Sequence, residues 1–125
     1  VVNGATMDGR SVDEMSLMGP TRICRSGRNQ EQVDEEVKPS DFGLDIAEVK
    51  DLQGGDAVAN AKILEDILAG REKGVKCDMV LLNAAAAMAC AGLANNLEDG
   101  LVKGREVIAD GSAFERLRLL KESAK

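Results

Sequence analysis

Two adjacent carboxylates, Asp13 and Glu14, lie on a predicted loop after a strand, where such a pair could bind a metal ion. They follow an apolar start and a short polar stretch, and they precede Gly19-Pro20. Mg²⁺ prefers oxygen ligands, takes one or two carboxylates from a protein and completes its shell with water or substrate phosphates. Acidic side chains are mostly exposed and solvated, however. Taken alone, the pair therefore predicts a solvated loop, and a metal site needs support from its surroundings.

Two further features have a possible binding role and a simpler structural one. The turn Gly54-Gly55-Asp56 precedes a helical pattern, where backbone N–H groups could receive a phosphate. It lacks the Lys and Ser/Thr of a P-loop, so we favour a helix cap made by Asp56. Asn83 lies in an apolar helix and could contact a ligand. Buried amides usually satisfy backbone groups, which favours the structural role.

The composition excludes several classes of function. The chain has 125 residues, enough for one domain, a net charge of −6 and no His. The acidic balance argues against nucleic-acid or membrane partners, and the lack of His removes Ser-His-Asp and Cys-His catalysis. Cys24, Cys77 and Cys90 form no C-x-x-C pair, which predicts free thiols in a cytoplasmic protein. We expect Cys90 to be a small core residue.

The elements that would position these residues are short strands followed by helices. Residues 1–2 read as the end of a strand, and 21–25 and 30–37 as a hairpin around a turn at 26–29. Residues 39–44 then predict a turn or short helix. Four helices follow: one capped by Asp56 and ended by Gly70, a buried one opened by Asp78 and closed by Gly92, one from Asn96 to about Ala109, and a last one with a Ser112–Glu115 capping box.

Motifs spread along almost the whole chain carry a family resemblance. They are Val1-Val2-x-Gly4, Val12-Asp13-Glu14-Met15-Ser16, Gly19-Pro20-Thr21, Pro39-Ser40-Asp41-Phe42-Gly43-Leu44, Leu52-x-Gly54-Gly55-Asp56-Ala57 with Asn60-Ala61, Leu81-Leu82-Asn83-Ala84-Ala85-Ala86-Ala87, Leu97-Glu98-Asp99-Gly100, and Ile108-Ala109-Asp110-Gly111-Ser112-Ala113. In this order and spacing, they resemble the C-terminal part of the anthranilate phosphoribosyltransferase family, enzymes of tryptophan biosynthesis.

The resemblance implies a reaction and a cofactor. Members of the family join anthranilate to 5-phosphoribosyl-1-pyrophosphate (PRPP) and release pyrophosphate, and their acidic pair binds PRPP-associated Mg²⁺. That pair matches Asp13 and Glu14, and no catalytic residue is assigned in this chain. The approach to the pair, from Asp8, is longer by about two residues than the family pattern D-G-x-D-E. Asn3 stands where many members have His.

The resemblance also implies that parts of the site are missing. The glycine-rich PRPP loop, the anthranilate-contacting Arg and the helical dimerisation domain of the family lie upstream, so the substrate-binding residues of this chain are unknown. We expect a fragment of α/β class: a C-terminal portion with a short sheet segment and about four helices. Residues 1–53 would hold the strand and loop region with the metal motif, and residues 54–125 the helices. Alone it would be inactive without the N-terminal portion.

Two other functions remain open at this point. The chain could be a stand-alone interaction module that kept the fold without catalysis. It could also belong to a related phosphoribosyltransferase or nucleoside phosphorylase with another acceptor, because function depends on the site rather than on the fold. An upstream glycine-rich loop, on the same chain or on a partner, would favour the enzyme.

Overall fold

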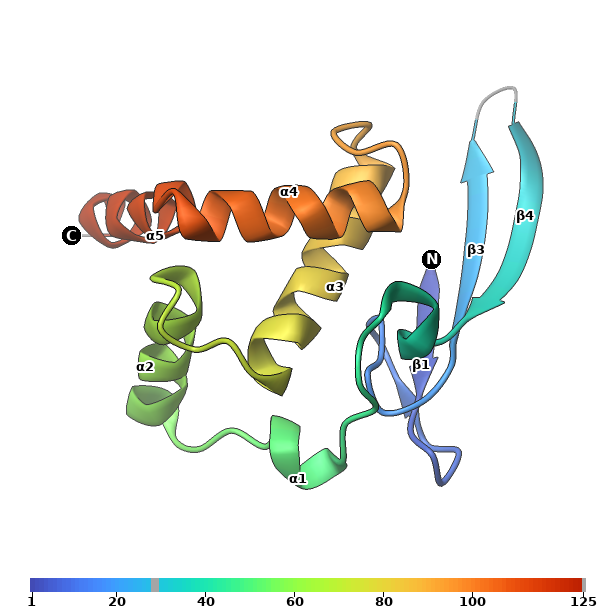
Figure 1. Cartoon of the computed structure of the whole chain (residues 1–125), viewed down its shortest axis with the longest axis horizontal. Helices are drawn as coiled ribbons and strands as arrows, with labels where there is room; N and C mark the ends of the chain where they lie inside the picture. Colours follow the sequence, from blue (N-terminus) through green and yellow to red (C-terminus); the bar gives the residue numbers. More distant parts are fainter. Residues whose placement is uncertain (28–29, 125) are drawn as a thin grey trace. The chain divides into compact units, whose positions relative to one another are not determined.

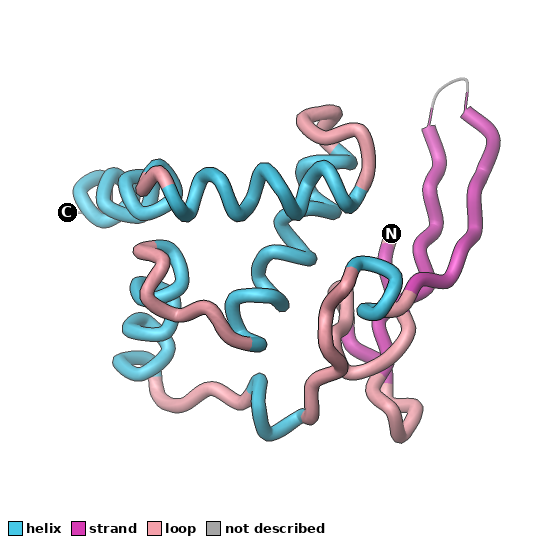
Figure 2. Tube along the Cα trace, in the orientation of Figure 1, coloured by secondary structure: helices cyan, strands magenta, loops and turns pink. Residues whose placement is uncertain are grey.

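The computed structural model describes residues 1–27 and 30–124, which form two compact units, Val1–Asp51 and Leu52–Lys125. The first unit contains all the strands and the second is built from helices (Figures 1 and 2). The fold class expected from the sequence, a short sheet segment followed by a cluster of helices, is confirmed. In the part of the chain that the structure describes, no helix is long and apolar enough to cross a membrane.

The first unit is a four-stranded antiparallel sheet. Its strands are β1 (Val2–Ala5), β2 (Ser11–Val12), β3 (Thr21–Gly27) and β4 (Gln30–Val37), in the order β2-β1-β3-β4. The predicted hairpin is therefore confirmed. Of its predicted turn at 26–29, the first two residues belong to β3 and the other two lie outside the described residues.

The loop between β2 and β3 supplies three of the buried apolar side chains of this unit, those of Met15, Leu17 and Met18. Met15 and Leu17 are each 1% exposed, and Ile23 of β3 is also buried. After β4, the short 3-10 helix η1 (Pro39–Phe42) confirms the predicted turn or short helix. It is followed by buried Leu44, and the chain then leads into α1 (Val49–Leu52). The sheet thus anchors the loop that carries the acidic pair.

The second unit consists of α2 (Ala57–Leu68), α3 (Val75–Cys90), α4 (Leu97–Ala109) and α5 (Ser112–Ser123). The predicted caps of α2 and α4 are confirmed: the Asp56 carboxylate accepts from the Ala59 N–H, and the Asn96 amide oxygen accepts from the Asp99 N–H, both at 2.8 Å. Gly70 follows α2 with φ = +70°, the left-handed conformation expected of a terminating glycine.

Helices α3 and α4 pack closely through glycines. A Cβ on Gly100 would lie 2.7 Å from the Ala85 Cα, and one on Gly104 would lie 2.8 Å from a methyl carbon of Leu81. Leu81 and Ala85 are buried at this contact. Small residues let two helix backbones approach each other, and Gly100 is the stricter requirement because its neighbour is the Ala85 backbone.

Three sequence predictions for this unit are wrong. Helix α3 begins at Val75 rather than at Asp78, which lies in its first turn. Cys90 ends α3 on the exposed surface and is not a core residue; the buried thiol is Cys77. The capping box of α5 does not form, because Gly111 takes the N-cap position with φ = +81°. The Ser112 hydroxyl instead donates to the Val107 carbonyl.

Candidate metal-binding loop

A tight turn sets the approach to the acidic pair. It joins β1 to β2, with Thr6 N–H donating to the Arg10 carbonyl and Gly9 N–H donating to the Thr6 carbonyl, both at 2.9 Å. Gly9 has φ = +82°, a conformation that favours glycine. The stretch from Thr6 to Arg10 is thus an ordered hairpin turn, which leads into β2 directly before Asp13.

Asp8 stabilises this turn through its charge. Its carboxylate accepts from the Thr6 hydroxyl and, at 3.0 Å, from the Arg10 Nε. Hydrogen bonds from Thr6 and then Arg10 favour the charged form and lower the Asp8 pKa from 3.8 to about 2. Asp8 is therefore committed to the turn, and the next acids along the chain are Asp13 and Glu14.

Asp13 and Glu14 follow β2 directly, and both side chains are exposed. Their position is defined by the sheet, because Val12 pairs with Gly4 of β1. Neither carboxylate forms an ion pair with any residue in 1–27 or 30–124. Two solvent-facing oxygen ligands thus stand next to each other at the end of a paired strand.

Buried hydroxyl groups hold the loop that follows the acids. The Ser16 hydroxyl donates to the Ala5 carbonyl at 2.7 Å and accepts from the Met18 N–H at 3.0 Å. The Ser16 N–H donates to the Thr21 hydroxyl at 2.9 Å. Ser16 and Thr21 are each 1% exposed. The loop is therefore tied by side-chain hydrogen bonds to β1 at one point and to β3 at another.

Glycines allow the same loop to lie against β1. A Cβ on Gly4 would meet the Glu14 carbonyl oxygen and would lie 2.7 Å from the Ser16 Cβ. A Cβ on Gly19 would lie 2.7 Å from the Ala5 carbonyl oxygen. Real Cβ atoms do not approach other atoms this closely, so the backbone path beside the acidic pair requires glycine at both positions.

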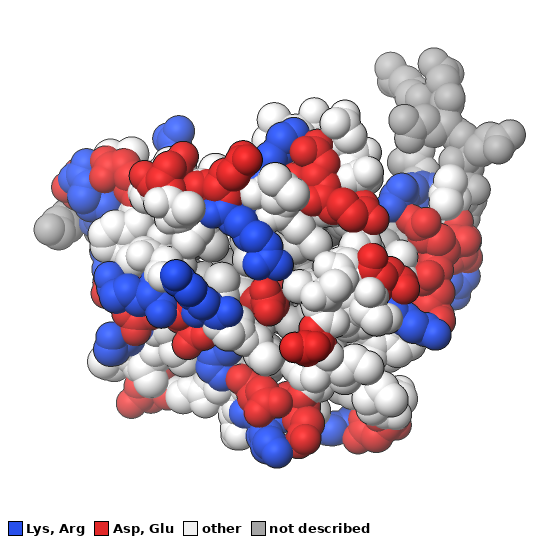
Figure 3. All heavy atoms as spheres, viewed as in Figure 1, with Lys and Arg blue, Asp and Glu red and all other residues white. Residues whose placement is uncertain are grey.

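The donor set suits Mg²⁺ better than a metal that needs a closed protein cage. Within the described residues, no three His, Cys, Asp or Glu side chains converge on one point. Two adjacent carboxylates are what a protein commonly gives to Mg²⁺, which keeps waters and binds substrate phosphates. On the face of the molecule drawn in Figure 3, Lys and Arg side chains are interspersed with Asp and Glu side chains. Asp13 and Glu14 thus fit a partial Mg²⁺ site.

The other two candidates have structural contacts. Asp56 caps α2, and the Asn60 side chain accepts from the Gly55 N–H at 2.8 Å while donating to the Gly55 carbonyl at 3.0 Å. A Cβ on Gly54 would collide with this Asn60 amide. These contacts agree with the capping role that the sequence favours for the glycine turn. The Asn83 side chain donates to the Met79 carbonyl one turn earlier, at 3.1 Å.

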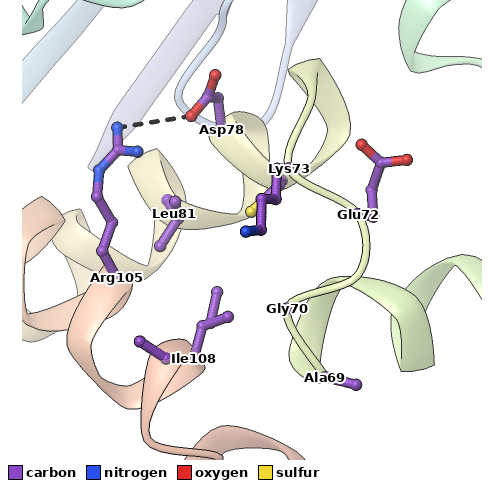
Figure 4. A pocket seen from close by; sticks show the side chains of 10 residues that line it. Ala69, Gly70, Glu72, Lys73, Asp78, Leu81, Arg105 and Ile108 are labelled. Atoms are coloured by element: carbon purple, nitrogen blue, oxygen red, sulfur yellow. Dashed lines mark ion pairs between the residues drawn. The ribbon is translucent and has the colours of Figure 1, made fainter.

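The helical unit contains a pocket of about 430 Å³ between the end of α2, the start of α3 and the end of α4 (Figure 4). Leu81 and Ile108 give it apolar walls, while Lys73 and Glu72 lie at its edge. Arg105 pairs with Asp78 across 3.6 Å, a long contact between partly exposed groups. Burial raises the pKa of the lining Cys77 thiol, so this thiol is a poor nucleophile.

Residues 1–114 match the family model described as "Glycosyl transferase family, a/b domain". The chain belongs to this family. It is 42% identical over 114 residues to an anthranilate phosphoribosyltransferase of Anaeromyxobacter dehalogenans, covering 90% of this chain and 33% of that protein. It is also 42% identical over 122 residues to one of Syntrophotalea carbinolica, covering 96% of this chain and 32% of that protein.

Solved structures show the same similarity in three dimensions. A crystal structure of anthranilate phosphoribosyltransferase from Thermus thermophilus aligns with a TM-score of 0.77 and 34% identity, covering 88% of this chain and 32% of that one. The Saccharomyces cerevisiae enzyme in complex with 4-fluoroanthranilate aligns with a TM-score of 0.77 and 25% identity, covering 94% and 33%. The resemblance inferred from the sequence motifs is confirmed. The chain spans about a third of the length of these relatives.

Sequence reasoning identified the acidic pair of this family member but missed the residues that hold it. Gly4 and Ser16 appeared only as members of the family motifs, and Thr21 only as a motif member and as the first residue of the predicted strand at 21–25. One signal was available: Ser16 is the single polar residue between Met15 and Met18 in a run that the structure buries. A polar residue enclosed in such a run usually has a hydrogen-bond partner to satisfy.

Proposed function

We propose that the protein containing this chain transfers a 5-phosphoribosyl group from PRPP to anthranilate. In this reaction the bond between the ribose C1 and the pyrophosphate oxygen breaks, and the anthranilate nitrogen bonds to C1 and loses a proton. Pyrophosphate leaves, and N-(5-phosphoribosyl)anthranilate, an intermediate of tryptophan biosynthesis, is formed. The proposal rests on family membership together with relatives at 40–42% identity that bear this enzyme name.

Asp13 and Glu14 would supply the protein's ligands for Mg²⁺. The observation that carries this assignment is their place at the end of β2, exposed and adjacent, on a loop fixed by Ser16 and Thr21. When bound, Mg²⁺ neutralises charge on the departing pyrophosphate. The two carboxylates would hold and orient the ion, either directly or through water, while the exposed side of the loop leaves room for a phosphate-bearing substrate.

The remainder of the site would come from outside this chain. Residues 1–125 would be the C-terminal portion of the PRPP-binding α/β domain, with the metal motif in 1–53 and the helices in 54–125. The N-terminal portion would bring the PRPP loop, the anthranilate contacts and the dimer interface. By itself the chain would be inactive, and the complete enzyme would act in the cytoplasm.

A reconstitution experiment tests this function. The chain is mixed with an upstream segment of a relative that carries the glycine-rich loop, and Mg²⁺-dependent consumption of PRPP is measured with and without anthranilate. We expect turnover only when both pieces, Mg²⁺ and anthranilate are present. Turnover with the chain alone would contradict its need for a partner, and no turnover in a mixture whose pieces associate would contradict the assignment.

A further inference from the structure

We propose that Ser16 and Thr21 are positioning residues for the metal site, acting by fixing the loop that carries Asp13 and Glu14. This inference rests on the proposed function, since it concerns the ion those carboxylates would bind. It assigns to two buried hydroxyl groups a role in metal affinity beyond their part in the fold. Neither hydroxyl touches the ion or a substrate in this account.

The geometry gives each hydroxyl a defined task. The Ser16 hydroxyl uses both of its capacities: it donates to the Ala5 carbonyl at 2.7 Å and accepts from the Met18 N–H at 3.0 Å. The Thr21 hydroxyl accepts from the Ser16 N–H at 2.9 Å. Only Met15 separates Ser16 from Glu14. This hydrogen-bonded group therefore lies two residues after Glu14.

These hydrogen bonds replace the regular backbone pairing that the loop lacks. Between β2 and β3, no residue belongs to a helix or strand. The N–H groups of Ser16 and Met18 are satisfied by side chains rather than by a backbone ladder. Met15 and Leu17, each 1% exposed, bury apolar surface on either side of Ser16. Packing of the apolar side chains can thus hold the loop in place, while the hydrogen bonds of the two hydroxyls fix the path of its backbone.

The path of the loop backbone matters because Mg²⁺ requires nearly ideal octahedral geometry with short metal–oxygen distances. A displaced backbone at Glu14 would move one ligand relative to the other. Residues that orient metal ligands through hydrogen bonds typically change metal affinity or activity by roughly 10- to 100-fold when they are replaced. We expect an effect in this range from removing either hydroxyl.

The test compares Thr21→Val with Thr21→Ser in the complete enzyme, with Ser16→Ala as a second removal. Val keeps the shape of Thr but lacks the acceptor, whereas Ser keeps the acceptor. Mn²⁺ titration by electron paramagnetic resonance measures metal binding without turnover, and kinetics give the Mg²⁺ activation constant and the KM for anthranilate. Ile23→Val, at the other buried position of β3, is the control for a modest loss of core packing that leaves the hydroxyl groups in place.

We expect Thr21→Val and Ser16→Ala to weaken Mn²⁺ binding and raise the Mg²⁺ constant about tenfold or more, with the KM for anthranilate unchanged. Thr21→Ser and Ile23→Val should behave as the parent. A lower melting temperature with unchanged metal constants would overturn the proposal, and so would failure of both removal variants to fold, since the hydroxyls would then serve the fold alone. If Asp13→Asn also leaves Mn²⁺ binding unchanged, the proposed metal site itself is wrong.

Discussion

Replacing Gly4 by Ala should damage the metal loop in a way the structure lets us quantify. The new Cβ would lie 2.7 Å from the Ser16 Cβ and 2.8 Å from the Val12 Cγ2, and it would press against the Glu14 carbonyl oxygen. Carbon atoms pack best at about 3.5–4.0 Å, so the loop must move by about 1 Å. Overpacking costs about 1–3 kcal/mol, and Ala recovers about 0.5–1 kcal/mol relative to Gly in a strand.

We therefore expect Gly4→Ala to lower the free energy of unfolding by about 0.5–2 kcal/mol. A displacement of about 1 Å can reduce catalysis by about 100-fold, so metal-dependent turnover should fall by one to two orders of magnitude. Urea unfolding gives the first quantity. Mn²⁺ titration and Mg²⁺-dependent kinetics of the complete enzyme give the second.

Gly43→Ala is the matched control, because it strains the backbone without moving the loop. Gly43 has φ = +67°, and a Cβ there would have no atom within 4 Å. The left-handed conformation should cost Ala about 1–2 kcal/mol, close to the loss expected for Gly4→Ala. If both variants lost metal affinity equally, or if Gly4→Ala kept it, the account of how β1 positions the acids would be refuted.

Three further results are expected. Hydrogen bonds from Thr6 and Arg10 hold the Asp8 pKa at about 2, so the stability that the Asp8 carboxylate gives the turn is present above about pH 4 and is lost as the pH falls towards 2. Carbon NMR of Arg10→Gln should show the Asp8 pKa rising towards 3.8. An unchanged pKa would contradict the role of Arg10. Gly100→Ala should cost about 1–3 kcal/mol in urea unfolding; a stabilised variant would contradict the close packing. Asp56→Ala should cost about 1 kcal/mol, and an unchanged midpoint would argue against its cap.

Local signals were sufficient to predict much of the fold. Asp56 and Asn96 cap helices as expected, because a short polar side chain can reach the free N–H groups of the next turn without help from distant residues. The capping box at Ser112 failed because Gly111, one residue earlier, adopts a left-handed conformation and makes Ser112 the first helical residue. The caps that form and the capping box that does not are both local effects, and the backbone conformation at the start of each helix determines which one occurs.

The sequence does not predict which residues of a helix tertiary packing will bury. Cys77 is flanked by Lys76 and Asp78, whereas Cys90 lies in an Ala-rich apolar run, yet Cys77 is buried and Cys90 is exposed. Helix α3 starts at Val75, three residues before the predicted Asp78, and packing against α4 selects which of its faces is covered. A helix that is apolar on all sides does not indicate which face will pack against a neighbour, so the exposure of Cys90 could not be predicted.

For the candidate site, too, the residue types could be predicted from the sequence, whereas the tertiary contacts could not. Residue type and family motifs pointed to Asp13 and Glu14, because carboxylates are the ligands that Mg²⁺ prefers. The groups that hold them come from β1, the loop and β3, and they meet only through the register that pairs Gly4 with Thr21. Periodicity does not reveal such a register when the strands are as short as β1 and β2.

The most direct test of the central claim is the metal dependence of Asp13→Asn and Glu14→Gln, made singly and together in the complete enzyme. Each change keeps the side chain's size and removes its charge, and the exposure of both residues predicts little effect on unfolding. We predict a raised Mg²⁺ activation constant, weaker Mn²⁺ binding and slower PRPP turnover, with the double variant most affected. Normal Mg²⁺-dependent turnover by the double variant would contradict the claim that these two carboxylates hold the ion.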